Sequence, residues 1–99
     1  MSSTKEFRDY VLEELRGLSD IVCKPMMGEF LLYYKGTLFG GIYDDRLLIK
    51  MTKSNAKYDM QTVIPYNNAK PMYKVAELDD TEYLAELIET TCNDLKNGK

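Results

Sequence analysis

The stretch FLLYYKGTLFGGIYDDRLLIK, residues 30–50, holds three runs of strand-forming residues separated by two short turn signals. Lys35-Gly36 is typical of a tight hairpin, because glycine supplies the positive φ that such a turn needs. Asp44-Asp45 marks the next turn. Connections this short join antiparallel neighbours. The stretch therefore predicts an antiparallel meander with strands at 30–34, 37–43 and 46–51.

Both flanks of this meander have the periodicity of amphipathic helices. Apolar residues recur every three or four positions over residues 4–16 and again after residue 79. Ser3 with Glu6, and Asp79 with Glu82, stand at capping-box spacing, which predicts where the two helices begin.

Shorter elements are expected between these parts. A brief edge strand at 21–24 precedes Pro25, and residues 61–71 are expected to form a loop because prolines and asparagines break regular structure there. A fifth strand is expected at 72–77. The sequence thus predicts a single α+β domain over residues 1–99, an antiparallel meander sheet packed with an N-terminal and a C-terminal helix.

Large side chains fall on both faces of the predicted meander. If both turns have two residues, one face carries an apolar set that suits two covering helices: Leu31, Tyr33, Leu38, Gly40, Ile42, Leu47, Ile49 and Met51. The other face carries six large aromatic or aliphatic side chains: Phe30, Leu32, Tyr34, Phe39, Tyr43 and Leu48. The second set is too large to leave in water. Either one helix covers each face of a monomer, or these six are the interface with a partner or a second copy in a homodimer.

The adjacent glycines Gly40 and Gly41 fit both arrangements. A missing side chain allows a helix or a partner backbone to approach closely, and it can also mark a β-bulge. The strand pattern around these glycines is unlike a phosphate-binding loop, which lies between a strand and a helix.

The composition narrows the classes of function. The net charge of −3 disfavours a nucleic-acid surface, although one alternative would use a set of lysines: Lys50, Lys53, Lys57, Lys70 and Lys74. The chain has no histidine, and its two cysteines, Cys23 and Cys92, are far apart, which argues against a zinc site. We therefore expect no cofactor and no enzymatic activity. No apolar run long enough for a membrane span and no signal peptide is present, so a cytoplasmic protein is expected.

The least regular apolar segment follows the first predicted strand. Lys24, Met26, Met27 and Gly28 form a candidate recognition site, because methionine lines adaptable binding surfaces as well as filling core gaps. The alternative to a protein-interaction role is a small-ligand binding module or an unrecognised enzyme, with its site between this segment and the loop at 61–70.

The longer string KPMMGEFLLYYKGTLFGGIYDDRLLIK, residues 24–50, resembles the N-terminal domain of the TfoX/Sxy family. The Lys70-Pro71-Met72 segment and the closing amphipathic helix are also similar to that family. The resemblance implies an α+β fold of the secretion-chaperone-like kind, in which dimers are common. It further implies a bacterial protein linked to natural competence, where family members act as transcriptional co-activators. We therefore expect a small regulatory domain that works through protein contacts.

Overall fold

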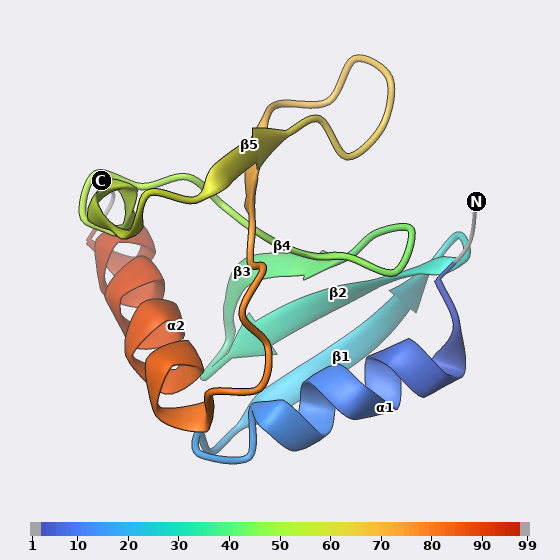
Figure 1. The fold of residues 1–99 in the computed structure, drawn as a ribbon, viewed down its shortest axis with the longest axis horizontal. Coiled ribbons are helices and arrows are strands. Elements are labelled where there is room, and N and C mark those ends of the chain that lie inside the picture. Colours follow the sequence, from blue (N-terminus) through green and yellow to red (C-terminus); the bar gives the residue numbers. More distant parts are fainter. Residues whose placement is uncertain (1–2, 98–99) are drawn as a thin grey trace.

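The computed structural model describes residues 3–97 and has an α+β fold, in which a six-stranded antiparallel sheet packs with an N-terminal and a C-terminal helix (Figure 1). This confirms the predicted fold class. The elements in chain order are α1 (Lys5–Glu14), β1 (Ile21–Met26), β2 (Glu29–Tyr34), β3 (Thr37–Ile42), β4 (Leu47–Ile49), the 3-10 helix η1 (Asn55–Tyr58), β5 (Gln61–Val63), β6 (Met72–Lys74) and α2 (Thr81–Lys96).

Three two-residue turns connect the first four strands. Both residues of each turn have a positive φ, in the pairs Met27 and Gly28, Lys35 and Gly36, and Asp44 and Asp45. A turn of this kind matches the twist of the strands that it joins. The two turns predicted within residues 30–50 are therefore confirmed.

Several element boundaries differ from the prediction. The caps are Thr4 and Asp80, whose side chains accept hydrogen bonds from the backbone N–H groups of Phe7 and Tyr83. The capping positions predicted at Ser3 and Asp79 were each wrong by one residue. The predicted loop at 61–71 was also wrong in its first part, since β5 occupies Gln61–Val63.

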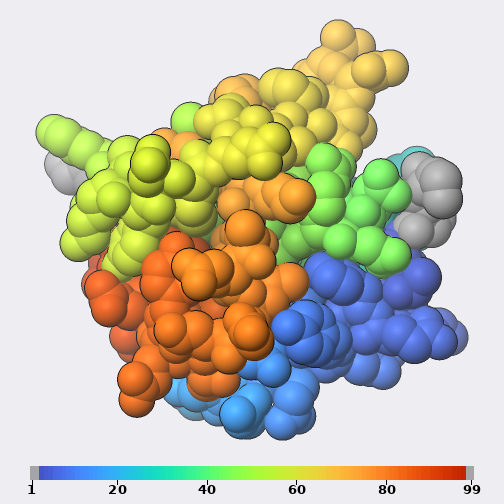
Figure 2. Space-filling model, viewed as in Figure 1, coloured from blue at the N-terminus to red at the C-terminus, as the bar shows by residue number. Residues whose placement is uncertain are grey.

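The strands lie in the order β1-β2-β3-β4-β6-β5. β1 is thus at one edge of the sheet, as predicted, but its predicted end before Pro25 was wrong, because the strand continues through Pro25 to Met26. An edge strand tolerates proline because its outer side needs no N–H donor. The chain passes β4, forms η1 beside α2, and returns as the β5–β6 hairpin with β6 against β4. The loop between β5 and β6 stands out from the rest of the molecule (Figures 1 and 2).

A bulge between β2 and β3 decides which side chains share a face. Leu32 pairs with Gly40 and Tyr33 pairs with Leu38, so Phe39 is an extra residue on β3. The predicted two-residue turn at Lys35-Gly36 would place Leu32 opposite Phe39 if β3 had no bulge, so the predicted register was wrong from the bulge onward. The register predicted between β3 and β4, with Gly40 opposite Ile49, is confirmed.

The bulge moves one set of β2 side chains onto the face that the helices cover. Phe30 and Leu32, predicted to lie on the second face, share the interior with Ile42 and Ile49. The buried core is Val11, Leu15, Leu18, Phe30, Leu32, Tyr34, Phe39, Ile42, Leu47, Ile49, Val75, Leu84, Leu87, Ile88 and Cys92. Leu31, Tyr33 and Leu38 are only half-buried and lie on the opposite face.

The two glycines allow this tight bend. A Cβ atom on Gly40 would collide with the carbonyl oxygen of Leu48 and would lie 2.8 Å from the Cα of Ile49. A Cβ atom on Gly41 would collide with the carbonyl oxygen of Phe30 and would lie 3.0 Å from the ring of Tyr43. The neighbouring backbones therefore occupy the space that side chains would need.

Candidate functional site

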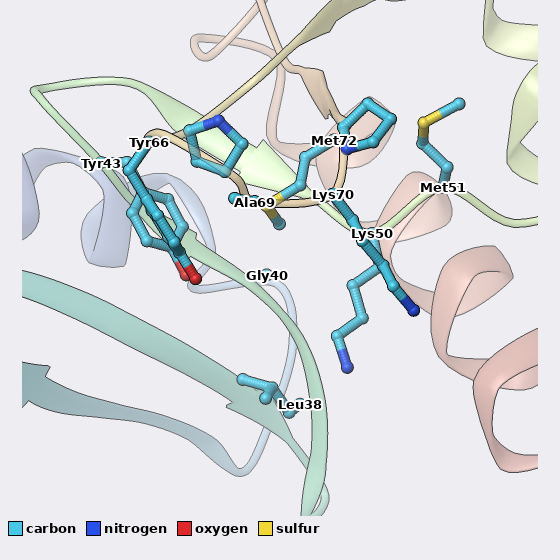
Figure 3. Close-up of a pocket in the computed structure, with 11 residues that line it drawn as sticks. Leu38, Gly40, Tyr43, Lys50, Met51, Tyr66, Ala69, Lys70 and Met72 are labelled. Carbon is cyan, nitrogen blue, oxygen red and sulfur yellow. The ribbon is translucent and has the colours of Figure 1, made fainter.

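A groove of about 570 Å³ lies between the outer face of the sheet and the β5–β6 loop (Figure 3). The outer face is the one that the helices do not cover. The lining residues are Leu38, Gly40, Tyr43, Lys50, Met51, Pro65, Tyr66, Ala69, Lys70, Pro71 and Met72. The groove is therefore apolar and aromatic for most of its length, and two lysines are the only charged residues that line it within residues 3–97.

Three parts of the chain form the groove. β3 and Tyr43 just after it contribute the floor, the residues after β4 contribute one wall, and the β5–β6 loop with Met72 of β6 contributes the other. The loop closes on itself through a hydrogen bond of 3.1 Å from the backbone N–H of Ala69 to the carbonyl oxygen of Tyr66. The pairing of Val63 with Met72 fixes both ends of the loop.

Two tyrosines from distant parts of the chain meet at one end of the groove. The ring centroids of Tyr43 and Tyr66 are 6.2 Å apart and the rings are tilted by 47°. Tyr43 is buried, whereas Tyr66 on the loop is 59% exposed. Burial raises the pKa of the Tyr43 hydroxyl, and Tyr66 and Glu29 raise it further. The Tyr43 hydroxyl therefore stays neutral near pH 7 and can donate a hydrogen bond.

The two lining lysines give the other side of the groove a positive charge. In Figure 3 the side chains of Lys50 and Lys70 both extend away from the two tyrosines. Among the residues that the structure describes, no aspartate or glutamate lines this groove. The arrangement suits an occupant with an apolar or aromatic part and a negatively charged part.

A buried polar cluster holds the wall that carries Lys50 and Met51. Asn55 is fully buried, and its side-chain amide donates hydrogen bonds of 2.9 Å to the carbonyl oxygen of Lys50 and to the hydroxyl oxygen of Thr91 on α2. Its side-chain oxygen accepts a hydrogen bond from the backbone N–H of Thr52. The cluster connects the groove wall to α2, and the sequence analysis did not identify it.

A second contact fastens the same segment at the surface. The backbone N–H and the hydroxyl of Ser54 donate hydrogen bonds of 2.8 and 3.0 Å to the two carboxylate oxygens of Asp94. These bonds, the backbone one foremost, lower the pKa of Asp94. The ionised carboxylate therefore helps to hold the start of η1 on α2.

The six residues predicted at an interface are all buried within this single chain. Phe30, Leu32, Tyr34 and Phe39 belong to the core beneath the helices. Tyr43 and Leu48 are buried outside that core cluster, and only Tyr43 lines the groove. The structure thus separates four of the six from the other two, because the bulge turns β2 over relative to the predicted register.

The predicted recognition site lies at the β1–β2 turn. The ammonium of Lys24 lies 5.2 Å from the centroid of the Tyr33 ring, and Met26 is half-buried. Met27 is 96% exposed at a φ of 51°, next to Gly28. None of these four residues lines the groove. The predicted ligand site also included the loop at 61–70, and part of that loop does line the groove. The role of the β1–β2 turn stays a prediction.

The described part of the chain has neither a candidate metal site nor a helix that could span a membrane. Within residues 3–97, no group of three histidine, cysteine or carboxylate side chains could hold a metal ion. No helix in that range is long and apolar enough to cross a membrane. Of the five lysines considered for nucleic-acid binding, Lys50 and Lys70 line the groove and the other three do not.

Comparison with known proteins does not assign this chain to a family. Neither a scan against protein-family models nor a search of curated proteins gave a match to this chain. The resemblance to the TfoX/Sxy family therefore stays a prediction from the sequence.

Proposed function

We propose that this chain is a small, non-enzymatic interaction domain that binds a protein partner in the groove beside the β5–β6 loop. The observation that carries the proposal is the exposed apolar rim of that groove. Tyr66 is 59% exposed, and Met51 on the opposite wall is 42% exposed. Tyrosine and methionine are enriched at protein interfaces, where burial of such side chains supplies much of the binding energy.

The lining residues also favour binding over catalysis. The groove offers two lysines and two tyrosines but no carboxylate, cysteine or serine, and the chain has no histidine. A lysine or tyrosine can move a proton, but the usual pairing of a nucleophile with a base is lacking along this lining. The proposal places the domain in the cytoplasm, in a bacterial regulator of transcription, as the resemblance to TfoX/Sxy proteins implies.

Selection of peptide ligands tests the proposal. A random peptide library displayed on phage is panned on the immobilised full chain, and the affinities of enriched peptides are measured for the wild type and for Tyr66→Ala. We expect the variant to bind about tenfold or more weakly, as for a central aromatic contact. Tyr10→Ala, which removes an exposed tyrosine from α1, is the matched control and should bind normally. If Tyr66→Ala binds every enriched peptide as tightly as the wild type, the groove is not the interaction site.

A small-molecule ligand is the second candidate, and the size of the groove favours it. A volume of about 570 Å³ falls within the roughly 300–1,000 Å³ that is usual for ligand pockets. A panel of anionic aromatic metabolites, screened by thermal shift, tests this function. A metabolite that stabilises the wild type and Tyr10→Ala but not Tyr66→Ala would establish it.

We also propose the homodimer that was expected from the sequence, but through a different interface. The six residues assigned to it are interior, so a dimer would have to use the outer face, where Leu31, Tyr33 and Leu38 are half-buried and Val22 is exposed. The lysines near this face, Lys24 and Lys50 among them, oppose a symmetric contact because like charges would face each other. Light scattering at low micromolar concentration tests it, and a mass of 11.5 kDa would exclude the dimer.

A further inference from the structure

From the charge of the groove we infer the chemistry of its occupant: an extended, acidic peptide segment that carries a large apolar side chain. This inference rests on the proposed interaction function and adds the partner class. The whole chain has a net charge of −3, yet the groove is lined by two lysines and by no acidic residue. The groove therefore has the opposite sign to the protein as a whole.

The acidic residues are concentrated on the helices. Within α1 four carboxylates accompany two basic residues, and within α2 four accompany one. An acidic partner would be repelled from the helices and attracted to the groove. Such complementarity steers encounter and sets the orientation of a bound segment.

The two ends of the groove differ, which gives an occupant a direction. The tyrosine pair lies at one end, where the aromatic ring of Tyr43 packs over Gly41. Burial, Tyr66 and Glu29 raise the pKa of the Tyr43 hydroxyl at this end. The lysines extend toward the other side (Figure 3). An apolar side chain of the peptide fits between the tyrosines, Pro65 and Met72, while its carboxylates pair with Lys50 and Lys70.

The exposed surface around the groove favours a peptide over a smaller anion. Met51 and Tyr66 line the groove and are 42% and 59% exposed, so they form an apolar rim at its mouth. Ile64, which precedes the lining residue Pro65, is 52% exposed. A small anion inside the groove would leave this rim in water. A peptide segment that crosses the rim would cover it, as the residues around an interface hot spot do.

Charge reversal provides the decisive test. Fluorescein-labelled peptides enriched on the wild-type chain are titrated against the wild type, Lys50→Glu, Lys70→Glu and Lys53→Glu, with binding followed by fluorescence polarisation. Lys53 is an exposed lysine near Lys50 in the sequence that does not line the groove, so its reversal controls for the change of net charge. We expect acidic residues to be enriched among the selected peptides, and each groove variant to bind about tenfold more weakly while Lys53→Glu binds normally.

The outcomes separate this inference from the proposed function. Suppose that Tyr66→Ala abolishes binding, but the peptides show no acidic enrichment and Lys50→Glu and Lys70→Glu bind normally. The groove then binds proteins, and the inference of an acidic partner is wrong. If Tyr66→Ala has no effect on any enriched peptide, the proposed function itself fails. If a labelled oligothymidylate binds in a manner that depends on Lys50 and Lys70 and no peptide does, the occupant is a phosphate polymer and the inference is overturned.

Discussion

The side-chain amide of Asn55 donates a hydrogen bond of 2.9 Å to the carbonyl oxygen of Lys50, so a fully buried residue fixes the backbone that carries one of the two groove lysines. Asn55 makes this contact from the first residue of η1, and it reaches Thr91 of α2 with the same amide group. The position of the groove wall therefore depends on the packing of η1 against α2.

Replacement of Asn55 by alanine should destabilise the protein and loosen this wall. The change leaves the buried backbone N–H of Thr52 without its acceptor, and we expect a loss of about 2–4 kcal/mol in the free energy of unfolding. Urea denaturation measures it. Ser54→Ala, which removes an exposed hydroxyl contact to Asp94, is the control and should cost about 1 kcal/mol or less. Equal losses for the two variants would show that the buried cluster has no special role.

Gly40→Ala should be strongly destabilising. The new Cβ atom meets backbone atoms of Leu48 and Ile49, which cannot move aside without distorting the sheet, so the cost should be about 1–3 kcal/mol or more. Gly17→Ala is the matched control, because its Cβ would lie 3.3 Å from a methyl group of Thr81 and would meet no backbone. Thermal unfolding of both variants should show a large decrease in Tm for Gly40→Ala alone. A Gly40→Ala variant as stable as the wild type would contradict the described contact between β3 and β4.

Two adjacent leucines test the bulge. Leu32 is fully buried in the core, whereas Leu31 is half-buried on the outer face. Leu32→Ala should therefore lower the free energy of unfolding by about 2–5 kcal/mol, and Leu31→Ala by only about 1 kcal/mol. Denaturant titrations compare the two. The reverse order would restore the register predicted from the sequence.

The buried thiol of Cys92 should make the folded protein less stable at alkaline pH. Burial raises the pKa of its thiol from 9.0 to about 11. Between these two values the unfolded chain releases the proton and the folded chain keeps it, so the folded state becomes less stable as the pH rises. At pH about 10.5 the wild type should have lost up to about 2 kcal/mol relative to pH 8 through this group. Tyrosines also titrate in this range, so the difference between the wild type and Cys92→Ala isolates the thiol. Identical pH profiles would contradict the prediction.

Local sequence patterns were sufficient for most elements of the fold. The periodicity around Val11 and Leu87 indicated both helices, and the two-residue turns at Lys35-Gly36 and Asp44-Asp45 indicated the hairpins. Alternation of residue types alone could not locate the bulge at Phe39, because the next two residues on β3, Gly40 and Gly41, have no side chain that would show which face each occupies. The exchange of faces between Leu31 and Leu32 follows from that one residue.

The candidate groove depended on contacts that the sequence did not reveal. Tyr43 and Tyr66 are separated by a turn, β4, η1 and β5, and the contact between their rings comes from the way the β5–β6 hairpin returns to the sheet. The loop was expected because it contains prolines, and both Pro65 and Pro71 line the groove. The signal that could have identified Asn55 was weak: a single asparagine after Ser54, in a largely polar segment.

An NMR titration tests the central claim most directly. The ¹⁵N-labelled chain is titrated with the tightest acidic peptide selected on it, and the shifted amide signals are mapped onto the structure. The account predicts that the shifts concentrate on Leu38, Tyr43, Tyr66, Ala69 and Lys70, with α1 and the exposed face of α2 unaffected. Shifts confined to the helices or to the β1–β2 turn, with the groove residues unchanged, would contradict it.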